Sequence, residues 1–218
     1  MPINNLLIDF DHTIFNSSQI KYEWAGIFEK CGVAKEAFWR TYPLARYGEG
    51  GRPVYSPRVH AELLKDLFTR GKEEVLEMIN AVKKRGADFL FPDVKKFLSR
   101  MVSLNVSMTL ILHGEKEYQK EKAESTGIID YFAKLHYSDS PRYKMVEELK
   151  LNPQDKIFWI SHNLNDMVEV KKRHPFIILI IKRSDDIPII HYRETGFLNF
   201  NNFEEMQEYL TIVQATSY

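Results

Sequence analysis

The sequence predicts an α/β fold in which a parallel, doubly wound sheet carries an inserted, all-helical domain. Short apolar stretches alternate with amphipathic helical stretches over residues 88–218, and one more apolar strand precedes a block of helices at residues 16–87. Strands that form continuous apolar runs are typically buried on both faces, so the alternation favours a parallel sheet covered by helices. We therefore expect residues 1–15 and 88–218 to form the α/β core and residues 16–87 to form the helical domain.

The elements of the core follow from the apolar pattern. Runs of strand length end in polar residues or glycine, and the stretches between them have helical spacing. The expected strands are residues 4–10, 106–112, 134–137, 156–160 and 176–182. The expected helices are residues 93–102, 115–125, 141–149, 165–173 and 203–210.

The inserted domain is expected to contain four helices and no strand. These helices are expected at residues 17–30, 35–42, 57–69 and 72–84, with Pro43 ending the second of them. Glycines and prolines over residues 46–57 predict a loop. Arg46 and Arg52 in this loop would suit an anionic substrate, and the alternative is that the loop is ordinary solvated surface.

Composition limits the partners and the compartment. Lysine plus arginine equal aspartate plus glutamate, at 30 each, so no net charge attracts the chain to nucleic acid or to an anionic membrane. The single cysteine, Cys31, excludes an intrachain disulfide and a cysteine-based zinc site. The first residues lack a signal-like pattern, and the longest apolar runs are of strand length. We expect a soluble, cytoplasmic protein that binds neither nucleic acid nor membrane.

Polar residues that could carry chemistry follow the first strand. Asp9 and Asp11 are two residues apart, so in an extended chain their side chains point to the same side, about 7 Å apart at the backbone. Two such carboxylates can share a metal ion, or act as nucleophile and general acid. The alternative is an aspartate-rich turn that only caps a helix.

Three later strand ends carry further candidates, because ligands of such sheets bind beyond the carboxyl ends of the strands. His113 and Gly114 open a helix, where backbone N–H groups suit a phosphate, although His113 is equally interpreted as an exposed loop residue. Lys144 could neutralise a phosphoryl group, with Arg142 as a rival for that role and a surface lysine as the alternative. Asp166 could point towards Asp9, directly or through Lys144, while Asn163 or Asn165 caps the helix. A small phosphorylated molecule is therefore the expected partner.

These sites, in this order, resemble those of the haloacid dehalogenase-like (HAD-like) phosphatases. Asp9, Asp11 and Thr13 match the Asp-x-Asp-x-Thr pattern that ends the first strand of that superfamily, and the resemblance covers nearly the whole chain. It implies a Rossmannoid core with residues 16–87 as a C1-type helical cap. It also implies that Asp9 is the nucleophile that forms an aspartyl-phosphate, and that Asp11 is the general acid and base.

The resemblance extends to the cofactor and the other site residues. It implies that Mg²⁺ is held by the Asp9 carboxylate and the backbone carbonyl of Asp11, with Asp166 as the last acidic residue of the fourth motif. Lys144 would be the lysine of the third motif. The remaining expected ligands of phosphate are Thr13, His113 and Gly114.

Two positions depart from the family pattern. Leu112 stands where a hydroxyl residue would bind phosphate, and such a lost hydrogen bond costs about 1.5–3 kcal/mol, or roughly ten- to a hundred-fold in rate. His162 stands where an aspartate would bind the metal. Because Mg²⁺ prefers oxygen ligands and imidazole suits transition metals, the metal could be a transition metal, Asp166 or Asn163 could replace the ligand, or metal binding could be weak.

Two functions of different classes follow from these motifs. The first is hydrolysis of a small phosphate monoester through an aspartyl-phosphate on Asp9, assisted by a metal ion. The second is a catalytically impaired binding or regulatory module that keeps the pocket, which Leu112 and His162 favour. A third, another HAD-like chemistry such as dehalogenation or a phosphomutase reaction, is favoured by no residue.

Overall fold

The computed structural model describes residues 2–46, 55–114 and 116–216. In this part of the chain, two compact units are present: Met1–Phe15 with Leu90–His113 and Ile128–Tyr218, and Asn16–Phe89 with Gly114–Gly127. We call the first the sheet unit and the second the helical unit. No helix in the described part of the chain is long and apolar enough to cross a membrane.

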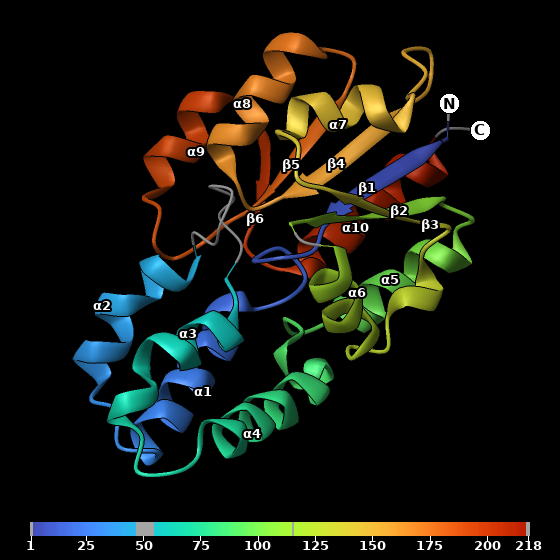
Figure 1. Cartoon of the computed structure of the whole chain (residues 1–218). Coiled ribbons are helices and arrows are strands. Elements are labelled where there is room, and N and C mark those ends of the chain that lie inside the picture. Colours follow the sequence, from blue (N-terminus) through green and yellow to red (C-terminus); the bar gives the residue numbers. More distant parts are fainter. Residues whose placement is uncertain (1, 47–54, 115, 217–218) are drawn as a thin grey trace. The chain divides into compact units, whose positions relative to one another are not determined.

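The sheet unit contains six parallel strands in the order β3-β2-β1-β4-β5-β6, which confirms the predicted parallel α/β fold (Figure 1). Five of the strands coincide with predicted ones. The sixth was not predicted, because it has only three residues, which is too short for a clear apolar run. The strands are β1 (Asn5–Asp9), β2 (Met108–His113), β3 (Lys134–Ser138), β4 (Ile157–Ser161), β5 (Ile178–Lys182) and β6 (Leu198–Phe200).

Helices cover both faces of this sheet (Figure 1). On one face, Leu7, Trp159 and Ile181 of the strands pack in one core cluster with Met145 and Met167 of the helices. On the other face, the two covering helices contact each other through their aromatic rings. The first face is covered by α7 (Arg142–Leu149), α8 (Leu164–Arg173) and α9 (Ile189–Thr195), and the second by α5 (Val94–Ser103) and α10 (Phe203–Ala215).

The helical unit contains no strand in its described residues. Its second helix runs through Pro43 to Arg46 instead of ending at the proline. Ala45 in the extra turn is fully buried and its carbonyl accepts a hydrogen bond from the backbone N–H of Ser56, so tertiary contacts hold this turn. The helices of the unit are α1 (Ser17–Lys30), α2 (Lys35–Arg46), α3 (Pro57–Leu64), α4 (Lys72–Lys84) and α6 (Lys116–Glu124), with short 3₁₀ turns η1 (Lys65–Leu67) and η2 (Gly86–Phe89).

The boundary between the units differs from the one expected from the sequence. Residues 114–127 were assigned to the core because they fit the alternation of strands and helices, but they pack with residues 16–89. Lys83 forms an ion pair with Glu121, and Gly86 lies so close to Ser125 that a side chain at position 86 would collide with it. The helical unit is therefore built from two separate segments.

A buried histidine organises the interior of the helical unit. His60 is fully buried, and its two ring nitrogens hydrogen-bond with the hydroxyls of Thr41 and Tyr55. The rings of Phe28 and Phe38 lie against it.

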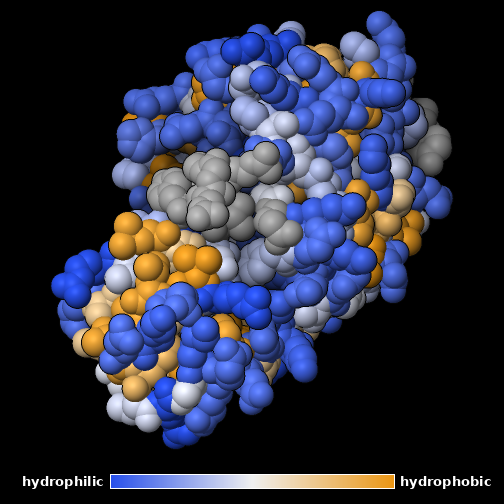
Figure 2. Space-filling model, in the orientation of Figure 1, coloured by the Kyte–Doolittle hydropathy of each residue, from blue (hydrophilic) through white to orange (hydrophobic). Residues whose placement is uncertain are grey.

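On the surface of the helical unit, Figure 2 shows apolar side chains gathered in a patch. Such patches are typical of surfaces that bind a partner or a ligand. The exposed large apolar residues of this unit are Tyr22, Trp39, Leu44, Val59, Leu63 and Leu67.

Candidate active site

Asp9, the last residue of β1, is buried at the carboxyl edge of the sheet. Its side chain is only 1% exposed, yet it accepts hydrogen bonds from three donors. Oδ2 accepts from Nε of Arg142 at 2.8 Å and from Oγ of Ser161 at 2.7 Å. Oδ1 accepts from Nε1 of Trp159 at 2.9 Å. Charge-assisted bonds of this kind stabilise the ionised carboxylate in a buried place.

Arg142, the first residue of α7, links two carboxylates. Its Nη1 forms a second ion pair, with Oδ2 of Asp166 at 2.5 Å, and its side chain is 11% exposed. Burial of Arg142 opposes its charge, but the Asp9 and Asp166 carboxylates outweigh this effect and raise the pKa of the guanidinium. Arg142 is thus the fixed cation of this site.

The prediction that Lys144 supplies this cation is wrong. Lys144 is exposed, and it lies two residues beyond Arg142 in the same helix. Two residues correspond to about 200° of rotation in an α-helix, so these side chains leave the helix on opposite sides. Asp166 therefore connects to Asp9 through Arg142 and not through Lys144.

Two donors to Asp9 were not predicted as site residues. In the sheet, Leu7 pairs with Trp159, and residues two positions further along the two strands are Asp9 and Ser161. Paired residues of parallel strands, and residues two apart on a strand, point to the same face, so all three polar side chains meet there. The register between β1 and β4 would have identified both donors.

Asn163 fixes the start of α8 and the position of Asp166. Its Oδ1 accepts a hydrogen bond from the backbone N–H of Asp166, and its Nδ2 donates to Oδ2 of Asp166. Asn163 or Asn165 was expected to cap this helix, and the cap is Asn163. The side chain of Asn163 therefore both caps α8 and orients the carboxylate of Asp166.

His162 and Thr13 bind each other. Oγ1 of Thr13 accepts a hydrogen bond from the backbone N–H of His162 and lies 3.2 Å from Nδ1 of its ring. Burial, together with the charge of nearby His12, lowers the pKa of His162 to about 4, so the ring is neutral near pH 7. The Thr13 hydroxyl, predicted to bind phosphate, is thus engaged within the chain.

His113 and Asp11 lie within electrostatic reach of the same site. His113 ends β2 and is half-buried. Burial and the Arg142 charge lower the pKa of His113, while the carboxylates of Asp9, Asp166 and Asp11 oppose the shift. Asp11 also acts on His162 in this way. A neutral imidazole at the end of β2 can donate one hydrogen bond and accept another.

Four further positions singled out from the sequence are not among the residues bonded to Asp9. Leu112 is fully buried in β2. Gly114 has a φ of 124° and is the first residue of a segment that belongs to the helical unit. Arg46 ends α2 in the same unit and is exposed. Arg52 lies outside the described residues.

The residues expected to hold a metal ion do not fit Mg²⁺ in this arrangement. Mg²⁺ requires oxygen ligands in a near-octahedral shell at about 2.0–2.1 Å. Both oxygens of Asp9 face hydrogen-bond donors, Oδ2 of Asp166 faces two, and a guanidinium cation already lies between the two carboxylates. His162 offers a ring nitrogen instead of an oxygen, and its Nδ1 lies beside the Thr13 hydroxyl. Among the described residues, no three His, Cys, Asp or Glu side chains are grouped to bind a metal.

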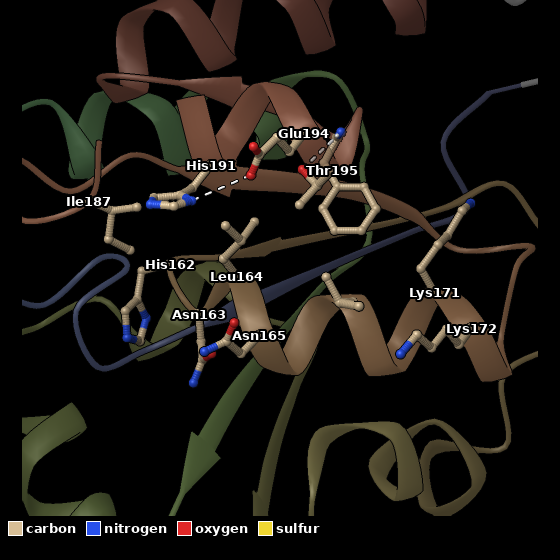
Figure 3. Close-up of a pocket in the computed structure, with 12 residues that line it drawn as sticks. His162, Asn163, Leu164, Asn165, Lys171, Lys172, Ile187, His191, Glu194 and Thr195 are labelled. Carbon is tan, nitrogen blue, oxygen red and sulfur yellow. Dashed lines mark hydrogen bonds and ion pairs between the residues drawn. The ribbon is translucent and has the colours of Figure 1, made fainter. Parts of the chain in front are cut away.

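A groove of about 900 Å³ begins beside this site and extends along α8 and α9 (Figure 3). Its polar end is formed by His162, Asn163 and Asn165, where α8 starts. Its walls include the apolar side chains of Leu164 and Ile187. This groove lies wholly within the sheet unit and is large enough for a small organic molecule.

Comparison with known proteins supports the fold. No family model matches the chain. No curated protein matches it in sequence. Solved structures do match: a dehalogenase with an intermediate complex has 13% identity and a TM-score of 0.66, with 94% of this chain and 96% of that chain covered.

Two further solved structures are similar over almost their full length. A protein assigned as a HAD-hydrolase from Bacillus subtilis, bound to magnesium, has 14% identity and a TM-score of 0.64, with 97% of this chain and 100% of that chain covered. A HAD phosphatase from Thermococcus onnurineus has 17% identity and a TM-score of 0.60, with 95% and 98% covered. The chain therefore has the fold of the HAD-like hydrolases, as the sequence predicts.

Proposed function

We propose that this protein is a hydrolase of a small phosphate monoester, with Asp9 as the nucleophile. The observation that carries the proposal is the unequal bonding of the Asp9 oxygens. Oδ2 accepts two hydrogen bonds, whereas Oδ1 accepts one, from Trp159, and so keeps a lone pair for attack. The similarity in fold to a HAD phosphatase supports the same class of reaction.

The proposed reaction has two steps. Oδ1 of Asp9 attacks phosphorus, the bond between phosphorus and the ester oxygen breaks, and Asp11 in its acid form gives the leaving oxygen its proton. Water then attacks the aspartyl-phosphate, Asp11 takes up a proton from that water, and phosphate and the Asp9 carboxylate are regenerated. Arg142 holds Asp9 in position and balances part of the negative charge throughout.

The sequence resemblance implies Mg²⁺, and one structural neighbour is described as bound to magnesium. Because the side chains around Asp9 do not fit this ion, both steps above use only groups of the chain. The helical unit would act as the cap that selects the substrate, with Arg46 as an anion-binding side chain. The groove along α8 would hold the leaving part of the ester.

A second candidate function, a binding module without turnover, is favoured by a specific observation. Three donors hold Asp9 in a site where the carboxylate is 1% exposed, and each hydrogen bond that stabilises an ionised carboxylate lowers its nucleophilicity. Such a module would bind a phosphorylated ligand and release it unchanged. The two candidates therefore differ in turnover and not in ligand class.

Release of phosphate from an aryl phosphate separates the two candidates. The native chain and Asp9→Asn would be assayed with a chelator and with Mg²⁺, Mn²⁺, Co²⁺, Ni²⁺ or Zn²⁺. Turnover by the native chain that Asp9→Asn loses would support the hydrolase. No turnover under any condition, with phosphate binding retained, would support the binding module and rule out the hydrolase for this class of ester.

A further inference from the structure

Arg142 uses only part of its hydrogen-bonding capacity. A guanidinium carries five N–H groups in a fixed plane. The N–H on Nε goes to Asp9 and one N–H on Nη1 goes to Asp166, so three N–H groups have no bond to the described part of the chain. The side chain is 11% exposed, and none of its nitrogens is among the buried polar atoms that lack a partner. Among the described residues, therefore, no group occupies these three N–H groups.

The orientation of these donors is fixed by the two carboxylates. Asp9 and Asp166 bind two edges of the planar guanidinium, and Asn163 holds Asp166 in turn. A planar fork held in this way is preorganised, so an oxyanion that binds its free edge causes little loss of side-chain freedom. Arginine is well suited to phosphate for the same geometric reason.

The same contacts work against a divalent ion at this place. A metal bound by Asp9 and Asp166 would lie beside a guanidinium that is 2.8 Å from the first carboxylate and 2.5 Å from the second. Like charges at such separations repel strongly in a partly buried site. Arg142 would have to move for a metal ion to bind both carboxylates.

We propose that Arg142 binds a phosphoryl oxygen directly through its free N–H groups and serves as the cation of the site in place of a divalent metal ion. This inference rests on the proposed function, because phosphate is the product of that reaction. It also goes beyond it, since it removes the requirement for a metal ion at this site. The ligand class is a phosphate or a phosphate monoester.

Calorimetric titration of the whole chain with inorganic phosphate tests this proposal. Titrations would be run with a chelator, with Mg²⁺ and with Mn²⁺. We expect saturable binding whose affinity changes by less than about threefold among the three conditions, since the cation that binds phosphate is part of the chain. An increase of more than about threefold on addition of either metal, or no saturable binding at all, would overturn the proposal.

Arg142→Met tests the residue itself. We expect phosphate binding to weaken by about tenfold or more, because a charge-assisted hydrogen bond is lost. Arg100→Met is the matched control, since Arg100 is an exposed arginine on α5 of the same unit, and we expect unchanged binding. Binding by Arg142→Met as tight as that of the native chain would refute the assignment.

Arg142→Lys covers the case in which Arg142→Met does not fold. It keeps a positive charge next to the two carboxylates, but a lysine offers a point charge without the planar fork. We expect a folded protein that binds phosphate several-fold more weakly than the native chain. Native affinity would contradict a role for the planar guanidinium in binding phosphate. These binding measurements are independent of turnover. An inactive chain that binds phosphate without metal would refute the hydrolase but leave this inference intact.

Discussion

At the scale of residues, Trp159 joins the apolar core to the candidate nucleophile. Its ring is fully buried in the cluster below α7 and α8, and its N–H is the donor to Oδ1 of Asp9. A side chain that serves both purposes cannot be exchanged for another aromatic residue without leaving Asp9 short of a partner. This dual role suggests a direct comparison between two tryptophans.

Trp159→Phe should destabilise the chain by about 1–3 kcal/mol more than Trp24→Phe. Both indoles are buried, but Nε1 of Trp24 has no hydrogen-bond partner in the described residues, so its loss removes no bond. Urea unfolding followed by circular dichroism would give the two free energies of unfolding. Equal losses for the two variants would mean that the bond to Asp9 contributes nothing to stability.

Sequence patterns identify only some of the residues of the candidate site. Asp9 and Asp11 follow from a strand that ends in carboxylates, and this needs only local spacing. Arg142 could not be separated from Lys144, because the direction of each side chain depends on the residue at which α7 begins. The contributions of Trp159 and Ser161 depend on the pairing of two strands that are about 150 residues apart in the chain.

At the scale of elements, the start of α8 combines structure and chemistry. Its N-cap residue, Asn163, bonds both the backbone and the carboxylate of Asp166. The N-cap of α10, Asn202, makes the equivalent backbone bond to Glu205, on a helix that covers the other face of the sheet (Figure 1). The two caps therefore allow helix stability and site geometry to be separated.

Asn163→Ala and Asn202→Ala should each lower the free energy of unfolding by about 1 kcal/mol, the usual cost of losing an N-cap. Only Asn163→Ala should also reduce phosphate release, since it frees the Asp166 carboxylate that holds Arg142. Urea unfolding and the aryl phosphate assay would be run on both variants. A similar loss of turnover in Asn202→Ala would point to a general effect of helix stability.

Elements with a strong apolar pattern could be predicted, and weak ones could not. The five apolar strands match the structure closely, whereas β6 and the short α9 were not predicted, because three and seven residues give no clear periodicity. The helix α6 could be predicted from its sequence, but its assignment to the helical unit could not. Its pairing with Gly86 and Lys83 depends on contacts far along the chain.

At the scale of the whole molecule, acid should act on each unit through a buried histidine. Burial lowers the pKa of His60 in the helical unit to about 4, and burial lowers that of His162 in the sheet unit to about 4. The folded pKa lies below the unfolded value of about 6.5, so the unfolded chain binds protons more readily. Stability is therefore complete above about pH 6.5 and falls as the pH drops towards 4.

His60→Gln should make the stability of the chain less sensitive to acid. The native chain should lose up to about 3 kcal/mol through His60 between pH 7 and pH 4, and the variant should lack this part because glutamine does not titrate. His191→Gln, at an exposed position on α9, is the control. Urea unfolding at several pH values would measure the slopes, and identical slopes for native and His60→Gln would contradict the prediction.

The contact between Gly86 and Ser125 should be sensitive to a single methyl group. A Cβ at position 86 would lie 2.0 Å from Oγ of Ser125 and 2.9 Å from its backbone carbon, so Gly86→Ala requires the backbone to move. We expect a loss of about 1–3 kcal/mol in the free energy of unfolding. Gly71→Ala, where no atom lies within 4 Å of the added Cβ, should cost much less, and equal costs would contradict the close packing at Gly86.

The two-segment construction of the helical unit has a consequence for recombination and for protein engineering. The chain leaves the sheet unit twice, once after Phe15 and once after His113, and returns each time. An exchange of residues 16–89 alone with those of a related protein would leave α6 facing foreign helices, without the glycine that makes room for Ser125. A transferable module would have to carry both segments, and one continuous exchange can do so only by also transferring Leu90–His113 of the sheet unit.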